Sequence, residues 1–481
     1  MNIIGVDKIL TGINGLDNIV GDGLPKGGLI ILAGNPGTGK TIFSAFFLYN
    51  GAVNYDEKGI YVSFAESRET FLKNMRGLGL DFEKLEMEGK FRFLDMLTVR
   101  GEAISAILET ILKEVKEIGA KRLVIDSFSA MAQAFKETHE VRVILHTILS
   151  KVTRLLGCTA ILIVEVPYGE SKIGLGMEEF VADGIIHLRR SELDGGRVFR
   201  DLEILKMRGV PIQESHIVFT LKGGFKALPP FKAKQVEKPC RFKPKADTEE
   251  YFSTGSPDID EMLGGGYSRG SSILVEITDA NVSTLHYHLI IYPTIWNFLV
   301  QGRGAIIFPS AGIDYSFILK RVKEAGLKED EINSLLRILV KDYAGIKPAP
   351  YLVTCRGERF SEDYAKCLEV EREIRERTNQ PILHFVGADM LIDTYGLKDA
   401  LSAIRNHSVR VREKGDLYMI LLKPGRPRLS EVLSAFSEFH LKITRKYGCA
   451  IIYGLKPRTP LYALEMDTSR GYFMPKLTQI I

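Results

Sequence analysis

Three glycines, a lysine and a threonine stand close together near the start of the chain, in an arrangement that could hold phosphate groups. The spacing G-x-x-x-x-G-K-[ST] is met by Gly34-Asn35-Pro36-Gly37-Thr38-Gly39-Lys40-Thr41. Glycines let the backbone turn so tightly that successive N–H groups point inward at phosphate oxygens. The Lys40 ammonium group would reach the β- and γ-phosphates, and the Thr41 hydroxyl would hold Mg²⁺. The stretch predicts a nucleoside triphosphate site.

An apolar run on each side of this loop predicts the elements that must position it. Residues 29–33 are typical of a short buried strand, and residues 42–49 of the start of a buried helix. A loop between a strand and a helix N-terminus is the context that the motif requires. The positive end of the helix dipole would add to the attraction for anions.

Two acidic residues follow other apolar runs, and both could serve phosphoryl transfer to water. Asp126 ends the run 122–125 and is our candidate for a second Mg²⁺ contact, with a helix N-cap as the alternative. Glu66 follows the predicted strand 60–64 and is our candidate for polarising the attacking water, with a solvated surface glutamate as the alternative. The carboxyl ends of parallel strands form the ligand edge of an open α/β sheet. We therefore expect both carboxylates near the loop.

The first half of the chain alternates apolar strands with amphipathic helices, which predicts an α/β fold with a mainly parallel sheet. The alternation stops between residues 230 and 250, where prolines stand among lysines and arginines. Such a run is typical of a solvated tether. We place a first domain at residues 1–229, a basic linker at 230–250 and a second domain at 251–481.

The opening of the chain returns after the linker. Thr11-Gly12 recurs as Thr254-Gly255, and Asp17 recurs as Asp260, both at an offset of 243 residues. Self-similarity without gaps indicates a duplicated domain.

The same offset shows that the second copy does not retain the phosphate loop. Gly39 falls on Val282 and Lys40 on Ser283, so a branched side chain replaces a needed glycine and the positive charge is gone. We expect the second domain to keep the fold and to lack a nucleotide site.

The composition of the chain indicates its general class and limits its partners. The chain has 481 residues, 45% of them hydrophobic and 26% charged, which is typical of a soluble protein with several domains. A formal net charge of +4 neither requires nor excludes a nucleic acid partner. Five cysteines without a C-x-x-C pair suit reduced thiols, and the most apolar run, residues 285–300, is too short to span a bilayer. We expect a cytoplasmic protein with no membrane partner.

Residues 11–228 resemble a domain of KaiC, the RecA-superfamily ATPase of the cyanobacterial clock, and of its archaeal KaiC-like relatives. Besides the phosphate loop, the resemblance is carried by residues 23–27 (GLPKG), 47–51 (FLYNG), 176–183 (GMEEFVAD) and 202–209 (LEILKMRG). It implies tandem RecA-like P-loop domains, each a mainly parallel sheet flanked by helices. It also implies ATP as the nucleotide and a homo-oligomeric ring, usually a hexamer, with ATP between adjacent subunits.

The resemblance also implies residue roles. Glu66 matches the second of two adjacent catalytic glutamates, but the first is Ala65 here, so we expect slow turnover. Lys206 and Arg208 match a basic pair that reaches the γ-phosphate of the neighbouring subunit; without the resemblance, Lys-x-Arg on a strand is typical of a solvated face. Glu165 lies where the family carries residues that sense the γ-phosphate.

Three functions remain open. The first is an ATP-hydrolysing oligomeric switch whose inactive second domain is architectural or binds a protein partner. The second is a RecA- or RadA-like ATPase acting on DNA, for which the stretch 167–177 offers only Lys172 and Tyr168 as binding groups. The third is a scaffold that responds to ATP without hydrolysing it. An autokinase or circadian role does not follow, because the second half has no phosphate loop.

Overall fold

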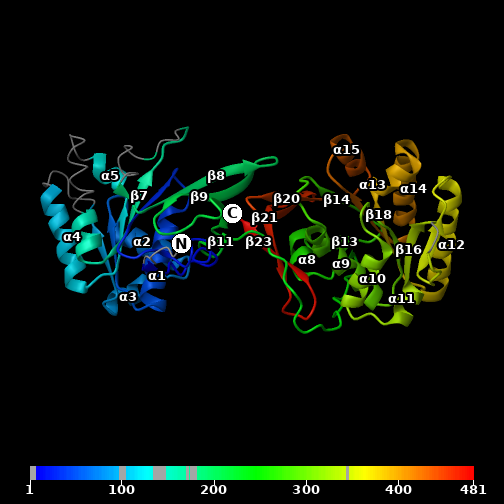
Figure 1. Cartoon of the computed structure of the whole chain (residues 1–481), viewed down its shortest axis with the longest axis horizontal. Helices are drawn as coiled ribbons and strands as arrows, with labels where there is room; N and C mark the ends of the chain where they lie inside the picture. The colour runs from blue at the N-terminus through cyan, green and yellow to red at the C-terminus, as the bar shows by residue number, and fades with distance from the viewer. Residues whose placement is uncertain (1–6, 97–103, 134–147, 170–172, 174–180, 343–345) are drawn as a thin grey trace. The chain divides into compact units, whose positions relative to one another are not determined.

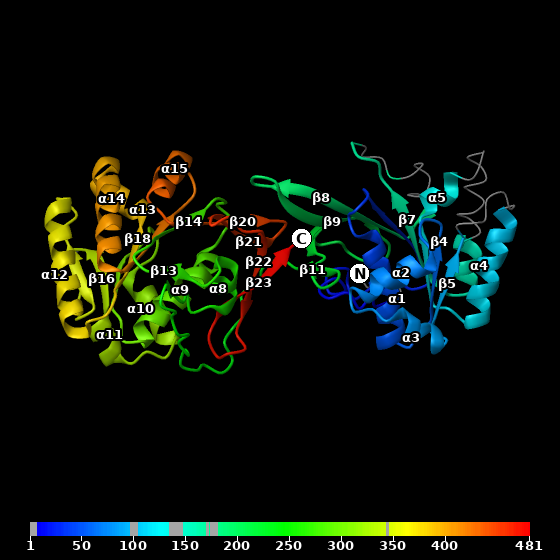
Figure 2. The same cartoon turned by 180° about the vertical axis from the view of Figure 1, so that it is seen from behind.

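The computed structural model describes residues 7–96, 104–133, 148–169, 173, 181–342 and 346–481. The chain divides into two compact units. The first contains residues 1–230 with 447–449 and 479–481, and the second contains residues 231–446 and 450–478. In each unit, helices cover both faces of a central sheet (Figure 1, and from behind Figure 2).

The first unit is built on a nine-stranded sheet in the order β11-β10-β9-β8-β3-β7-β6-β4-β5. The six strands from β8 to β5 in that order are parallel, and β9, β10 and β11 are added antiparallel. The strands of this sheet are β3 (Leu29–Gly34), β4 (Gly59–Ser63), β5 (Phe91–Asp95), β6 (Arg122–Asp126), β7 (Thr159–Glu165), β8 (Gly184–Leu193), β9 (Arg197–Met207), β10 (His216–Thr220) and β11 (Lys226–Leu228). A separate two-stranded sheet consists of β1 (Lys8–Ile9) and β2 (Leu24–Pro25). The helices are α1 (Lys40–Asn54), α2 (Arg68–Arg76), α3 (Phe82–Met87), α4 (Ile104–Ile118), α5 (Phe128–Gln133) and the π-helix η1 (Ile148–Leu155).

Alternate residues of the central strands enter two separate cores. Ile30 and Leu32 of β3 pack with α1 and α2, whereas Leu29 and Ile31 pack in the core that includes α4 and α5. All six residues of β3 are buried. A strand buried on both faces is continuously apolar, which is why the run before the phosphate loop shows no polar alternation.

The second unit contains a ten-stranded sheet in the order β17-β16-β15-β18-β19-β14-β20-β21-β22-β23. The strands of this sheet are β14 (Ser272–Ile277), β15 (Ala305–Phe308), β16 (Leu336–Lys341), β17 (Leu352–Cys355), β18 (Leu383–Gly387), β19 (Leu417–Leu422), β20 (Phe439–Lys446), β21 (Cys449–Lys456), β22 (Leu461–Asp467) and β23 (Met474–Ile480). A separate two-stranded sheet consists of β12 (Tyr251–Phe252) and β13 (Tyr267–Ser268). Its helices are α8 (Pro257–Leu263), α9 (Thr284–Val300), α10 (Tyr315–Glu324), α11 (Glu329–Leu335), α12 (Phe360–Thr378), α13 (Ala388–Tyr395), α14 (Leu397–Lys414) and α15 (Pro427–Ala435).

The two sheets confirm the predicted tandem α/β fold. Read from β23, the second sheet repeats the order of the first strand for strand, with β14 in the place of β3, and β17 is added at the far edge. Strand β14 (272–277) lies 243 residues after β3 (29–34), the offset of the sequence repeat.

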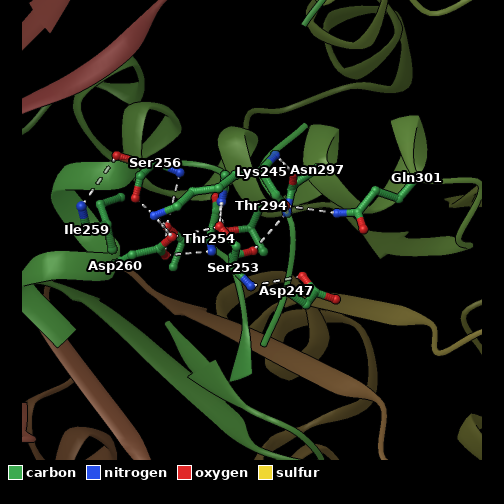
Figure 3. Close-up of polar contacts among 11 residues, drawn as sticks. Lys245, Asp247, Ser253, Thr254, Ser256, Ile259, Asp260, Thr294, Asn297 and Gln301 are labelled. Carbon is green, nitrogen blue, oxygen red and sulfur yellow. Dashed lines mark hydrogen bonds and ion pairs between the residues drawn. The ribbon is translucent and has the colours of Figure 1, made fainter. Parts of the chain in front are cut away.

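In the repeated Thr-Gly…Asp motif, the aspartate carboxylate holds the Thr-Gly segment by hydrogen bonds. We call this arrangement the carboxylate bracket. In the first unit, Asp17 accepts hydrogen bonds from the Thr11 amide (2.8 Å), the Thr11 hydroxyl (2.7 Å) and the Gly12 amide (2.9 Å). In the second unit, Asp260 accepts from the Thr254 amide at 2.8 Å and hydroxyl at 2.7 Å (Figure 3). One carboxylate thus fixes the segment that leads into each domain.

Residues 231–250 contain no helix or strand and most of them are exposed, but a few contacts anchor the segment to the rest of the second unit. Phe242 is 2% exposed and packs against Trp296. Lys245 donates its ammonium group to Asp260 at 2.7 Å, and the side chain of Asn297 bonds both its amide and its carbonyl (Figure 3). Phe242 and Lys245 thus anchor the segment, which its composition alone did not indicate.

Candidate nucleotide site

The glycine-rich loop joins β3 to α1, as the sequence predicts. Strand β3 ends at Gly34 and α1 begins at Lys40. Gly37 and Gly39 have φ angles of 75° and 102°, in the left-handed region that side chains rarely adopt. The loop therefore depends on these two glycines. It leaves the N-terminal end of α1 directed at the space where a phosphate would bind.

Lys40 contacts its own loop in this structure. Its ammonium group donates to the carbonyl oxygens of Gly34 at 2.8 Å and Asn35 at 3.0 Å. Burial lowers the pKa of Lys40, and the nearby carboxylates of Glu165 and Asp126 oppose that shift. A phosphate would offer a charged acceptor in place of two neutral carbonyls, which makes the stronger hydrogen bond.

Asp126 meets the loop at the end of β6. The Thr41 hydroxyl donates to its Oδ2 at 2.8 Å, and the Tyr61 hydroxyl donates to the same oxygen. The alternative role, a cap for the helix that follows, belongs instead to Ser127, whose hydroxyl accepts from the Ala130 amide at 3.1 Å. Hydroxyl and carboxylate oxygens are ligands that suit Mg²⁺, which usually takes its remaining ligands from phosphates and water.

Tyr61 is the member of this group that sequence analysis did not single out. It lies in the middle of β4, its ring is fully buried, and it packs against Phe71 and Phe93 at centroid distances of 4.5 and 5.6 Å. Burial and the Asp126 charge raise the pKa of Tyr61 well above its ordinary value, so the hydroxyl remains a donor at physiological pH. A tyrosine among aliphatic strand residues was the available signal.

Glu66 follows β4 and is half-buried, beside the exposed Ala65. The Ser63 hydroxyl fixes this turn by donating to the Glu66 carbonyl at 2.7 Å and accepting from the Glu66 amide at 3.0 Å. Burial, with the charge of Asp126, raises the pKa of Glu66, while a hydrogen bond from Asn74 opposes the shift. A carboxylate with a raised pKa is a better proton acceptor than an ordinary surface glutamate.

These residues surround a cleft of about 630 Å³, within the size range of small-molecule sites. Its wall combines the loop and the acidic groups with an apolar part. It is lined by Pro36, Gly37, Gly39, Lys40, Thr41, Ile42, Ala65, Glu66, Asn74, Met75, Leu78, Asp126, Glu165 and Leu221. The polar end suits phosphates, and Met75, Leu78 and Leu221 offer a surface for a base.

Residues 166–168, which follow β7, are hydrogen-bonded to the phosphate loop. Asn35 donates its side-chain amide to the carbonyl oxygens of Val166 at 2.8 Å and Pro167 at 3.1 Å. The Tyr168 hydroxyl donates to the Pro36 carbonyl at 3.0 Å. Tyr168, considered above as a stacking group for DNA, thus contacts the phosphate loop.

Lys172, the basic residue considered for DNA, lies outside the described residues, as do residues 176–180 of the KaiC-like block at 176–183.

Lys206 and Arg208 lie near the amino ends of the parallel strands, whereas their own phosphate loop lies at the carboxyl ends. Lys206 of β9 pairs with Ile185 of β8, which is level with Ile31 of β3, three residues before Gly34 and about 10 Å from it along the strand. Arg208 is an exposed side chain that donates to Asp183 at 2.9 Å. Burial, then the charge of Arg208, lower the pKa of Lys206.

The corresponding region of the second unit has different chemistry. Between β14 and α9 the side chain of Val282 is buried, and Ser283, in the place of Lys40, is the N-cap of α9. The nearest counterpart of Asp126 is Asp389 in α13. Its carboxylate accepts from the Ser310 hydroxyl at 2.8 and 2.9 Å and the Ala311 amide at 3.1 Å.

A glycine-rich loop before a helix, with an acidic strand end bonded to the loop threonine, defines a P-loop nucleotide-binding domain of the α/β class. The model of the KaiC ATPase family matches residues 9–225. The circadian clock oscillator protein KaiC of Thermostichus vulcanus is 30% identical over 374 residues, which cover 72% of this chain and 68% of that protein. The chain belongs to the KaiC family.

Other relatives match over a smaller share. The KaiC protein of Synechococcus elongatus is 34% identical over 277 residues, 56% of this chain. The chain spans about half the length of that relative, 52%. A crystal structure of a KaiC-like protein from Pyrococcus horikoshii is 35% identical, with a TM-score of 0.43, and the match covers 47% of this chain and 100% of that one.

None of the helices within the described residues has the length and apolar character needed to cross a membrane.

Proposed function

We propose that the first unit binds ATP with Mg²⁺ and hydrolyses it slowly, in an oligomer, and that the second unit has no nucleotide site. The observation that carries this proposal is the convergence of Lys40, Thr41, Asp126 and Glu66 on one 630 Å³ cleft. Membership of a family of ATPases supports it.

Each residue has a separate task in this proposal. The backbone amides of residues 34–41 and the Lys40 ammonium group bind the phosphates, and Thr41 and Asp126 hold Mg²⁺. Mg²⁺, when bound, would neutralise charge on the β- and γ-phosphates. Glu66 orients the attacking water and accepts its proton, for which a raised pKa is suitable. The absence of a second carboxylate at Ala65 is our reason to expect slow turnover.

Lys206 and Arg208 are proposed to act on the site of an adjacent copy. Lys206 lies about 10 Å along the sheet from the level of Gly34, on the side away from its own phosphate loop, and Arg208 follows it just beyond the end of β9. The end of the sheet opposite the loop can meet the loop end of a neighbour in a head-to-tail arrangement, which forms a ring when the rotation between subunits closes. This supports a homo-oligomer, and a hexamer is the size that the resemblance to KaiC implies. The second unit would then have an architectural role or bind a protein partner.

The test is phosphate release from Mg²⁺-ATP, with oligomer mass measured in parallel. We expect Lys40→Ala to lower the rate about 100-fold or more, because it removes positive charge from the transferred phosphoryl group. The matched control is Ser283→Ala, at the same position of the second unit, which should leave the rate unchanged. Assembly on ATP without turnover would favour the non-hydrolysing scaffold instead. An effect of Ser283→Ala equal to that of Lys40→Ala would contradict the assignment of the active site to the first unit.

A further inference from the structure

Residues 479–481 belong to the first unit, although more than 240 positions separate them from the rest of its main segment. They are hydrogen-bonded to the end of β10 and to the turn that follows it. The Thr220 hydroxyl donates to the Gln479 carbonyl at 2.8 Å and accepts from the Ile481 amide at 3.4 Å. The Lys222 ammonium group donates to the side-chain oxygen of Gln479 at 2.6 Å.

The two residues that bind this segment flank Leu221, which lines the nucleotide cleft. Leu221 packs on the phosphate loop, where its methyl carbons lie 3.0 and 3.1 Å from the position that a Cβ of Gly39 would take. The buried Thr220 hydroxyl also accepts from the Lys222 amide at 3.1 Å. One hydroxyl thus fixes both the turn that carries Leu221 and the 479–481 segment.

Arg200 of β9 connects the same segment to the phosphate loop directly. Its Nη1 donates to the Gly37 carbonyl at 3.1 Å, and its Nε donates to the Ile481 carbonyl. Apart from the chain neighbours of Gly37, no heavy atom of the described residues lies within 4 Å of the position that a Cβ of Gly37 would take. Side-chain packing therefore does little to hold this part of the loop, and the hydrogen bond from Arg200 matters more.

Neither Arg200 nor the 479–481 segment lines the cleft. Both contact its wall from outside, so they can affect a bound nucleotide only through the loop and Leu221. A loop that is held in place before the ligand arrives loses less conformational freedom on binding, which raises the affinity. By linkage, a nucleotide that binds better when the segment is in place must also stabilise the segment.

We propose that residues 479–481 are positioning residues of the nucleotide site, which hold the phosphate loop through Arg200 and one wall of the cleft through Leu221. This inference rests on the function proposed for the first unit and adds a means of regulating it. Residues 479 and 480 are also the end of β23, whose other residues belong to the second unit. Release of the segment lowers nucleotide affinity, and bound nucleotide keeps the segment in place.

The first test measures Mg²⁺-ATP affinity of the full chain by calorimetric titration, with phosphate release in parallel. Thr220→Val removes the hydroxyl that binds the segment. We expect it to weaken ATP binding about three- to tenfold, the equivalent of one hydrogen bond. The rate at saturating ATP should stay unchanged, because the segment does not touch the reacting atoms. Thr220→Ser keeps the hydroxyl and should restore the affinity.

The second test uses the reciprocal effect on the segment itself. Hydrogen exchange of the peptide that contains residues 474–481 should slow when Mg²⁺-ATP is added to the wild type. Lys40→Ala, which lacks a charge that binds phosphate, should not show this protection. Thr220→Val at saturating ATP should also lose it. A segment that only stabilises the fold would exchange at the same rate with and without nucleotide.

Three results would overturn the proposal: equal ATP affinity in Thr220→Val and wild type, no recovery in Thr220→Ser, or exchange of residues 474–481 that does not respond to ATP. Should Thr220→Val fail to fold, Gln479→Ala removes the bond to Lys222 from the segment side. It should weaken ATP binding at least about twofold, and unchanged affinity there contradicts the proposal equally. Failure of the wild type itself to bind Mg²⁺-ATP would refute the proposed function as well, so the two failures are distinguishable.

Discussion

The chemistry proposed for the first unit depends on how one carboxylate oxygen of Asp126 is held in place. Oδ2 of Asp126 accepts from both Thr41 and Tyr61, so the carboxylate is held from the loop side and from the core side. Tyr61 does not line the cleft, and it is a positioning residue. When Thr41 turns to Mg²⁺, the Tyr61 hydroxyl would keep the carboxylate in place.

We predict that Tyr61→Phe raises the Mg²⁺ concentration needed for half-maximal phosphate release several-fold, with a smaller change in the maximal rate. The ring contacts with Phe71 and Phe93 remain, so stability should fall by about 1–3 kcal/mol, the loss of one hydrogen bond to a charged group. The measurements are a Mg²⁺ titration of activity and urea unfolding. Tyr49→Phe, in the same aromatic cluster against Phe82, is the control and should leave the Mg²⁺ dependence unchanged.

Glu66 predicts a pH dependence. Because the pKa of Glu66 is raised, its carboxylate becomes protonated at a higher pH than that of an ordinary glutamate. Once protonated, Glu66 cannot accept the proton of the attacking water. The acid limb of kcat/KM against pH should therefore lie above the usual range of a glutamate. Glu66→Gln should lower the rate about 100-fold or more and remove that limb. A limb unchanged in Glu66→Gln would assign the titration to another group.

At the scale of elements, the duplication separates what holds a domain together from what does chemistry. Both units keep the carboxylate bracket, with Asp17 in one and Asp260 in the other, whereas the phosphate loop is present only in the first. In the second unit the bracket also fixes the segment before it, through Lys245 (Figure 3). The retained motif thus has the same structural role in both units.

We predict that Asp260→Ala destabilises the second unit by about 2–4 kcal/mol, because it leaves buried donors of Thr254 and Ser253 and the Lys245 charge without their acceptor. Trp296, the single tryptophan of the chain, is buried in this unit, so its fluorescence in urea follows the second unit alone. ATP binding by the first unit should not change. Glu261→Ala, an exposed position on the same helix, is the control; equal loss there would indicate a general effect on α8.

At the scale of the whole molecule, the proposed site is complete only when two copies meet. The loop and the acidic residues lie at one edge of the first sheet, and Lys206 and Arg208 at the other. A single copy would bind nucleotide at its loop edge without the second source of positive charge. Hydrolysis would then depend on assembly more steeply than binding does.

We predict complementation between two inactive variants. Lys40→Ala and Arg208→Ala should each release little phosphate alone, yet a mixed oligomer should recover about a quarter of the wild-type rate, because random head-to-tail contacts pair an intact loop with an intact arginine at that frequency. The measurement is phosphate release after subunit exchange. The control mixes Lys40→Ala with Thr41→Ala, which share one edge and should not complement. If Arg208 acts within its own chain, the first mixture stays inactive.

The sequence by itself determined the features that depend on local spacing. The phosphate loop, its strand and its helix are one continuous segment, and an offset of 243 residues marks the duplication without any knowledge of the fold. It also indicated Asp126 and Glu66, because a strand end is visible as the end of an apolar run.

Only the tertiary structure decided which distant residues meet. Tyr61 joins Asp126 across 65 positions because β4 and β6 are neighbours in the sheet, and strand order is set by packing. The residues of 231–250 pack on the second unit through Phe242 and Lys245, where composition indicated a tether. One cavity of the second unit is lined by residues of four strands and three helices that carry no shared motif. Burial and pairing between segments far apart in the chain have no local pattern, so they were not available before the fold.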